Sequence, residues 1–364
     1  MVENSERELS RANTRIRFEQ WANNPECEAN TVSAVLNVKM GKVAEELGYP
    51  NTKAPSPFAI VRGLAFEDYL FENDAAKLRQ PLEYLKALQA GSSGFLDFRT
   101  TNNGGPKYSN LDEAIEASAD FLKNLANGCL MEVPSITTGI TLRLAKGVML
   151  PEATLILDVM TVSASIGSQK VLLRVGEIKI YPDRGGYTDG EHLASARAQA
   201  GVYKHALEEW VEMQGLSEFF DIDDTGFLVF TWPGSIFPVV RPAEDLRAQA
   251  KRAQRGFSQL DVVAQRAVGA DLNNYNPDDY NSWVQHSKTN YRETCWAFCD
   301  LAPRCQDQAL ADKRGVLLGQ ATGKLLATST ISRAIELLNG AMPESGFEES
   351  LKKQLSEANW GEVN

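Results

Sequence analysis

The spacing of apolar residues changes along the chain, and the change restricts the folds that this chain can adopt. Between about residues 130 and 181 the apolar residues are rich in β-branched types and interrupted by turn residues, which predicts successive strands. Residues 191–213 show helical spacing, and residues 226–232 (GFLVFTW) predict one more strand. This order of strands, helix and strand predicts a mixed α/β core.

Helical spacing extends on both sides of this core. Asn110 stands where it can cap the last of the preceding helices. Residues 91–110 are rich in Gly, Ser and Asn and predict a loop. From Pro242 onward the chain is predicted to be helical, with a break at residues 273–283. The helices expected before the strands cover about residues 6–22, 31–47, 61–76, 81–90 and 111–127.

The composition is typical of a globular protein, with 364 residues of which 43% are hydrophobic and 23% are charged. No apolar run approaches the roughly 18 residues of a membrane span, and the first twenty residues lack the apolar segment of a signal peptide. These features predict a cytoplasmic protein with no membrane partner. The net charge of -11 argues against binding nucleic acid by bulk attraction, although it leaves room for a local basic groove.

Two charged residues stand in a strand that is otherwise apolar. Glu177 and Lys179, in the sequence GEIK, are two residues apart and therefore share one face of the strand. Asp158 ends the apolar run ATLILD on the preceding predicted strand. If these strands pair, two carboxylates that suit Mg²⁺ or Mn²⁺ meet a lysine that can offset charge on a phosphate. An isolated E-x-K pair is more often part of a solvated face.

Two predicted helices carry further polar residues of interest. Gln199 and Tyr203, in QAGVYKHAL, are four residues apart and share a helix face, with small residues between them that allow close approach to a sheet. Glu67, in VRGLAFEDYL, lies one turn after Gly63. Each of these residues alone is readily explained as a half-buried or surface position. Their occurrence together and in this order favours a functional site.

The succession RGLAFE, ILD, GEIK and QAGVY resembles the RecB-like branch of the PD-(D/E)XK nuclease superfamily over roughly residues 60–210. The resemblance implies a restriction-endonuclease-like α/β core, a mixed β-sheet flanked by helices. It divides the chain into three parts. These are an N-terminal helical region at 1–60 with the first cluster cysteine, a nuclease core at 61–240, and a C-terminal helical region at 241–364 with a cysteine cluster.

The resemblance also implies roles for the residues of the site. Asp158 and Glu177 would bind Mg²⁺ or Mn²⁺, with the main-chain carbonyl of Ile178 as a further candidate ligand. Lys179 would be the catalytic lysine. Glu67 would be a metal ligand at a helix position that is often histidine in this branch, a departure that bears on metal preference and cleavage polarity.

The same resemblance implies that Gln199 and Tyr203 complete the catalytic set on the DNA-binding side. The implied function is a metal-dependent DNA nuclease, exonuclease-like on single-stranded or end-bearing DNA, in DNA repair, recombination or phage and CRISPR defence. Its partners would be DNA and a helicase or defence complex. The alternative is a catalytically inactive DNA-binding scaffold subunit of such a complex, against which the intact Asp158, Glu177 and Lys179 set argues.

The five cysteines are few and odd in number, which does not suit a disulfide framework. Cys295, Cys299 and Cys305 fall within eleven residues, whereas Cys27 and Cys129 stand alone. The chain resembles the iron–sulfur exonucleases of CRISPR adaptation and the AddB-type subunits, which bind a [4Fe–4S] cluster through one cysteine before the core and three after it. The resemblance implies that all but Cys129 are ligands, here spaced C-x3-C-x5-C rather than C-x2-C-x5-C. Zinc on the same thiolates, or no metal, are the alternatives.

Two basic segments also need an interpretation. Residues 319–324 (GQATGK) lack the glycine spacing and the Ser/Thr of a phosphate loop, and no strand precedes them, so a helix-rich region is expected. Residues 247–255 (RAQAKRAQR) predict a basic helix. Such a helix is usually a solvated face, but here it could supply the local positive surface that the acidic chain otherwise lacks.

Overall fold

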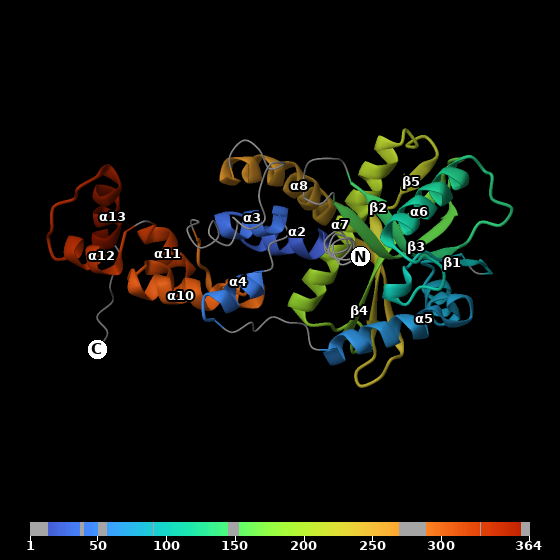
Figure 1. Ribbon diagram of the computed structural model, residues 1–364, viewed down its shortest axis with the longest axis horizontal. Coiled ribbons are helices and arrows are strands. Elements are labelled where there is room, and N and C mark those ends of the chain that lie inside the picture. The colour runs from blue at the N-terminus through green and yellow to red at the C-terminus, as the bar shows by residue number, and fades with distance from the viewer. Residues whose placement is uncertain are drawn as a thin grey trace. The chain divides into compact units, whose positions relative to one another are not determined.

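The computed structural model describes residues 14–36, 40–49, 57–89, 91–144, 153–268, 289–327 and 329–357, which fall into two compact units (Figure 1). Of these residues, unit one contains 14–19, 35–36 and 57–268. Unit two contains 20–34, 40–49 and 289–357. Unit two is therefore assembled from two segments that lie far apart in the sequence.

Within its described residues, unit one is built on a mixed sheet of seven strands (Figure 1). The strands are β1 (Phe95–Asp97), β2 (Ile136–Arg143), β3 (Thr154–Ala164), β4 (Val171–Pro182), β5 (Phe220–Ile222), β6 (Thr225–Thr231) and β7 (Pro238–Asp245). Their order is β1-β2-β3-β4-β6-β7, with β5 beside β4. β4 pairs antiparallel with β3 and parallel with β5 and β6, while β2–β3 and β6–β7 are antiparallel and β1–β2 is parallel.

Helices flank this sheet, which confirms the predicted mixed α/β fold of a sheet flanked by helices. They are α5 (Pro57–Tyr84), interrupted at Glu72–Ala75, α6 (Leu111–Ala126), α7 (Gly190–Met213) and α8 (Arg247–Val268). The predicted cap at Asn110 is confirmed, since its side chain accepts a hydrogen bond from the Glu113 N–H at 3.0 Å. No helix within the described ranges combines the length and the hydropathy that crossing a membrane requires.

The two faces of the sheet are covered by different helices. Phe66 and Leu70 of α5 pack in one cluster with Val159 of β3 and Ile178 of β4. Because successive side chains of a strand point to opposite faces, the neighbours of Val159 and Ile178 point to the other face. That other face is where α7 packs on β4, β3 and β2. Polar side chains next to Val159 and Ile178 are therefore directed toward α7.

Close packing of α8 on α7 depends on a glycine. A Cβ atom at Gly201 of α7 would lie 2.3 Å from the Cβ of Gln249 on α8, closer than Cβ atoms approach in proteins. Phe18 of α2 (Thr14–Asn23) stacks on Phe257 of α8 with ring centroids 4.0 Å apart. The helical layer on this side of unit one thus requires the smallest residue at the crossing of α7 and α8.

Unit two is helical among its described residues (Figure 1). Beside parts of α2 and α3 (Glu28–Leu36), its helices are α4 (Met40–Glu46), η4 (Glu293–Ala297), α10 (Ala302–Ala311), η5 (Gly315–Leu318), α11 (Gln320–Leu326), α12 (Ile331–Leu338) and α13 (Gly346–Glu357). Contacts join its two sequence segments. Arg292 forms an ion pair with Glu26, and the Tyr49 hydroxyl lies 3.0 Å from Asp307 Oδ2.

The structure corrects several expectations at the edges of the sheet. The predicted loop at 91–110 contains β1, and the three-residue strand β5 was not predicted at all. The stretch from Pro242, predicted to be helical, first completes β7, and α8 begins at Arg247. Strands of three residues are too short to show a period, and β7 is an edge strand in which a proline costs no ladder hydrogen bond.

One helix expectation also changes. The helix predicted at 81–90 is displaced toward the N-terminus, because the second helical part of α5, after the interruption at Glu72–Ala75, contains Pro81 and ends at Tyr84. Of the helix predicted at 31–47, residues 31–36 belong to α3 and residues 40–46 to α4, and residues 37–39 lie outside the described residues. Residues 6–13 of the first predicted helix and the predicted break at 273–283 lie outside the described residues. GQATGK falls in and next to α11, as predicted for a helix-rich region.

Substituting Gly201 by alanine should destabilise unit one by about 1–3 kcal/mol, because the added methyl group must displace α8. The matched control is Gly190→Ala at the start of the same helix, where no atom lies within 4 Å of the new Cβ. Urea unfolding of both variants provides the measurement. Equal stabilities of the two variants would contradict the close α7–α8 crossing.

Candidate active site

An acidic centre lies where β3 and β4 run side by side. Val159 of β3 pairs with Gly176 of β4, so Asp158 and Glu177, the next residues toward the same end, lie opposite one another. Lys179 follows two residues later, and its Nζ lies 2.5 Å from Glu177 Oε1. The structure thus brings these three predicted residues to one place on the α7 face of the sheet.

Glu177 is the most buried member of this centre. Its side chain has 0% exposure, between β3 on one side and Leu228 of β6 on the other, while the side chain of Lys179 is 18% exposed. A buried carboxylate costs several kcal/mol unless an opposite charge lies close to it. Lys179 supplies that charge.

The carboxylate of Asp158 is held at both oxygens. The Tyr203 hydroxyl donates to Oδ1 at 2.8 Å, and the main-chain N–H of Ile178 donates to Oδ2 at 3.1 Å. The Thr138 hydroxyl donates to the main-chain carbonyl of Asp158 at 2.6 Å. These bonds fix the orientation of Asp158 before any ligand binds, so little reorganisation is needed at the site.

Tyr203 and Gln199 have different surroundings although they share a helix face. The Tyr203 ring is 1% exposed, so this residue meets the centre through its hydroxyl group alone. Gln199 lies one turn earlier, and its side-chain amide donates to Glu19 Oε2 on α2 at 3.2 Å. The structure therefore places Tyr203 against Asp158 and ties Gln199 to α2.

Glu67 approaches the centre from α5. Burial, followed by the charge of Asp158, raises the pKa of its carboxyl to about 7, although Arg99 and Lys179 act to lower it. Arg99 Nη1 lies 3.3 Å from Glu67 Oε2, and Arg99 Nη2 lies 2.8 Å from Asp97 Oδ2. The charges of Asp158 and Lys179 thus act on the Glu67 carboxyl.

A cavity of about 240 Å³ opens at this centre. It gives the carboxylates of Glu67 and Asp158 a common space that faces solvent. Its polar lining comes from Glu67, Arg99, Asn103, Thr138, Asp158 and Tyr203. A hard divalent cation and a phosphate group both suit a space lined by carboxylate, hydroxyl and guanidinium groups.

Sequence reasoning missed Arg99, which lies in a stretch predicted to be a loop. It is positioned by Gly139, whose φ of 71° and lack of a side chain let the Arg99 main chain pass, since a Cβ there would lie 2.5 Å from Arg99 N. The guanidinium also lies over the Phe71 ring, 4.9 Å from its centroid. The sequence signal that could have identified Arg99 was its position two residues after Asp97 in FLDFR.

Four of the five cysteines are buried in unit two, whereas Cys129 is exposed. Burial raises the pKa of the Cys299 thiol, and the nearby sulfurs of Cys305, Cys27 and Cys295 raise it further. Burial, followed by Cys27, likewise raises the pKa of Cys305 to about 11. The four thiols are therefore close enough within unit two to interact electrostatically, although Cys27 and Cys295 lie about 270 residues apart in the sequence.

Hydrogen-bond donors point at these sulfurs. The main-chain N–H groups of Asn290, Asn30 and Ala29 donate to Cys27, and that of Leu301 donates to Cys299. The Thr289 hydroxyl bonds Cys305, and Asn24 Nδ2 lies 3.5 Å from Cys295 Sγ. Among the residues that the structure describes, no group of three or more His, Cys, Asp or Glu side chains is arranged to hold a metal ion.

Replacing Glu67 by glutamine should raise the melting temperature of the metal-free protein at about pH 8, with a gain that shrinks toward about pH 5. The pKa of about 7 in the folded protein exceeds the ordinary value of 4.5, so folding is penalised by the carboxylate above pH 7 and relieved of this penalty as pH falls. Thermal unfolding in EDTA across this range gives the measurement. Asp68→Asn, an exposed neighbour that also faces Arg99, is the control. A pH-independent gain would contradict the raised pKa.

The two clusters differ in the ligands that they offer. No family model matches this chain, and no curated protein matches its sequence. The residues offer oxygen ligands grouped around one lysine in unit one, and four buried thiols with polar donors in unit two.

Proposed function

We propose that the chain is a metal-dependent DNA nuclease of the PD-(D/E)XK type, exonuclease-like on single-stranded or end-bearing DNA. The observation that carries this proposal is the contact of 2.5 Å between Lys179 Nζ and Glu177 Oε1, opposite the fixed carboxylate of Asp158. Of these residues Asp158 lines the cavity, while Glu177 and Lys179 lie beside it in the sheet. A lysine beside two carboxylates is the set of groups that phosphodiester hydrolysis requires. The mixed sheet flanked by helices is compatible with the core of that superfamily.

The chemistry of the ligands fits Mg²⁺ or Mn²⁺. Glu67, Asp158 and Glu177 supply carboxylate oxygens, with the carbonyl of Ile178 as a further candidate ligand. Three carboxylates share the charge of only Lys179 and Arg99 among the contacts described above, so a divalent cation would offset their mutual repulsion. When bound, such a cation would supply Lewis-acid stabilisation of charge on phosphate oxygens.

The protein residues would perform the remaining tasks. The ammonium of Lys179, held by Glu177, would stabilise negative charge that develops on the phosphate. Tyr203 and the Ile178 N–H would keep Asp158 oriented as a ligand. Gln199, on the same face of α7, would support the DNA-facing side through its bond to α2.

The four buried cysteines fit a [4Fe–4S] cluster. Cys27, Cys295, Cys299 and Cys305 supply the four thiolates, and N–H donors to sulfur are characteristic of such sites. The raised thiol pKa values mean that the thiolate charges need a cationic partner inside the unit. When bound, the cluster would cross-link the two sequence segments of unit two. Zinc on the same thiolates is the alternative.

Under this proposal the protein acts in the cytoplasm, where cysteines stay reduced. DNA repair, recombination or phage and CRISPR defence would supply single strands and free ends as substrate. A helicase or a defence complex would be the partner that exposes those ends.

Lys179→Ala should reduce Mn²⁺-dependent cleavage of labelled single-stranded DNA by about a hundredfold or more per folded molecule. Because this change leaves buried Glu177 without its nearest cation, stability should also fall, by about 3–5 kcal/mol. Lys179→Arg keeps the charge and separates the two effects, since it should fold well and still cleave slowly. Lys170→Ala, an exposed lysine just before β4, is the matched control. Full cleavage by both Lys179 variants would contradict the catalytic role of Lys179, whereas DNA binding without any cleavage by the wild type would favour the inactive scaffold.

Cys27→Ser should remove the brown colour and most of the about four irons per chain expected in anaerobically purified protein. The reason is that Cys27 alone brings the N-terminal segment to the other three thiols. Cys129→Ser is the matched control, because that thiol is exposed and outside the group. Iron analysis and the visible spectrum give the measurement. A colourless wild-type protein with one tightly bound zinc would replace the iron–sulfur proposal by the zinc alternative.

A further inference from the structure

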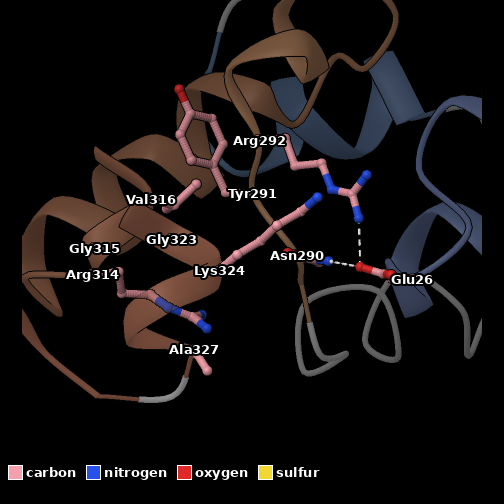
Figure 2. Close-up of a pocket in the computed structure, with 10 residues that line it drawn as sticks. All are labelled: Glu26, Asn290, Tyr291, Arg292, Arg314, Gly315, Val316, Gly323, Lys324 and Ala327. Atoms are coloured by element: carbon pink, nitrogen blue, oxygen red, sulfur yellow. Dashed lines mark hydrogen bonds and ion pairs between the residues drawn. The ribbon is translucent and has the colours of Figure 1, made fainter. Parts of the chain in front are cut away.

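A second cavity, of about 270 Å³, lies in unit two and has a basic lining (Figure 2). It is separate from the acidic centre of unit one, and no lining residue is shared. Its charged and polar lining residues are Glu26, Asn290, Tyr291, Arg292, Arg314 and Lys324. Three of these side chains are cationic and one is anionic, in a chain whose net charge is -11.

The single carboxylate that lines this cavity, that of Glu26, already has partners within the protein. Glu26 Oε2 lies 2.5 Å from Arg292 Nη2 and accepts a hydrogen bond of 3.0 Å from Asn290 Nδ2. Among the described residues, the side chains of Arg314 and Lys324 have neither an ion pair nor a hydrogen bond. The charges of Arg292 and Glu26 cancel each other, so the lining keeps a net charge of about +2 from Arg314 and Lys324.

Two glycines bring these cations to one cavity wall. A Cβ at Gly315 would lie 2.6 Å from the Leu326 side chain, and a Cβ at Gly323 would lie 2.9 Å from the main chain of Val316. Only with glycine at both positions can η5 and α11 pack this closely. Arg314 immediately precedes the first glycine and Lys324 immediately follows the second, so this packing places the main chain of both residues at the cavity.

The opposite wall belongs to the segment that carries the thiols. Figure 2 shows the Lys324 side chain extending across the cavity toward the Arg292 guanidinium and Glu26. The carbonyl of Asn290 accepts a bond of 2.7 Å from Asn24, whose side chain also reaches Cys295 Sγ. This wall is therefore held in place by bonds within unit two.

We infer that this cavity binds a phosphate group of a nucleotide or of a nucleic-acid strand. The two unpaired cations, Arg314 and Lys324, match the charge of about -1.5 to -2 that a phosphate monoester carries at neutral pH. They equally match two successive phosphodiesters of a strand, which carry one negative charge each. A guanidinium offers a fork of donors to phosphate oxygens, and an ammonium adds a point charge. This phosphate site lies outside the acidic centre. Phosphate binding here does not require that the acidic centre cleaves DNA.

The test uses full-length protein in EDTA, which prevents metal-dependent cleavage, and the double variant Arg314→Gln with Lys324→Gln. Lys353→Gln, an exposed lysine of α13 outside the cavity, is the matched control. The probes are a fluorescein-labelled single-stranded oligothymidylate, thymidine monophosphate and inorganic phosphate. Fluorescence anisotropy and calorimetry measure binding, and thermal unfolding checks that both variants are folded.

If the ligand is a strand phosphate, the double variant should bind the oligothymidylate at least about fivefold more weakly than the control. The slope of log K against log salt should then fall by about 0.7 for each phosphate that the variant no longer neutralises. If the ligand is a free nucleotide, wild type should bind thymidine monophosphate or phosphate and the double variant should not. Binding equal to that of Lys353→Gln with every probe would overturn the inference. Loss of cleavage in Lys179→Ala would leave these results unchanged, so the two proposals fail separately.

Discussion

The carboxylate of Glu177 is enclosed between strands of a sheet, and this burial governs the arrangement around it. An ionised group in that position is tolerated only with a cation at contact distance, and Lys179 provides one from the same strand. Two-residue spacing on a β-strand is the simplest way to hold such a pair, because both side chains then point to one face. Asp158 from β3 and Glu67 from α5 bring two further carboxyl groups close to this pair.

The fold could be predicted where elements are long and periodic. Strands β3 and β4 and helices α6 and α7 follow from apolar spacing and from caps such as Asn110. β1 and β5, with three residues each, are defined by pairing with distant strands, and local sequence carries no trace of that pairing. β7 tolerates Pro242 because it is an edge strand, a position that only the complete sheet order reveals.

The site could be predicted only in part, for a related reason. The shared face of Glu177 and Lys179 follows from spacing alone, whereas the position of Asp158 opposite Glu177 depends on strand register. Helical spacing places Gln199 and Tyr203 on one face, but their partners, Glu19 and Asp158, lie on different elements. Contacts between distant segments decide such details, and pattern reasoning does not include them.

Unit two is built from segments that precede and follow most of unit one in the sequence, and this has a consequence for synthesis on the ribosome. The segment with Cys27 emerges early, but the residues that complete its surroundings are translated only after the whole sheet of unit one. At typical translation rates of about 5–20 residues per second, roughly 270 residues separate Cys27 from Cys295, a delay of about 15–50 seconds. During that interval the Cys27 thiol lacks its neighbours Asn290 and Cys295. Unit one therefore has time to fold before unit two closes.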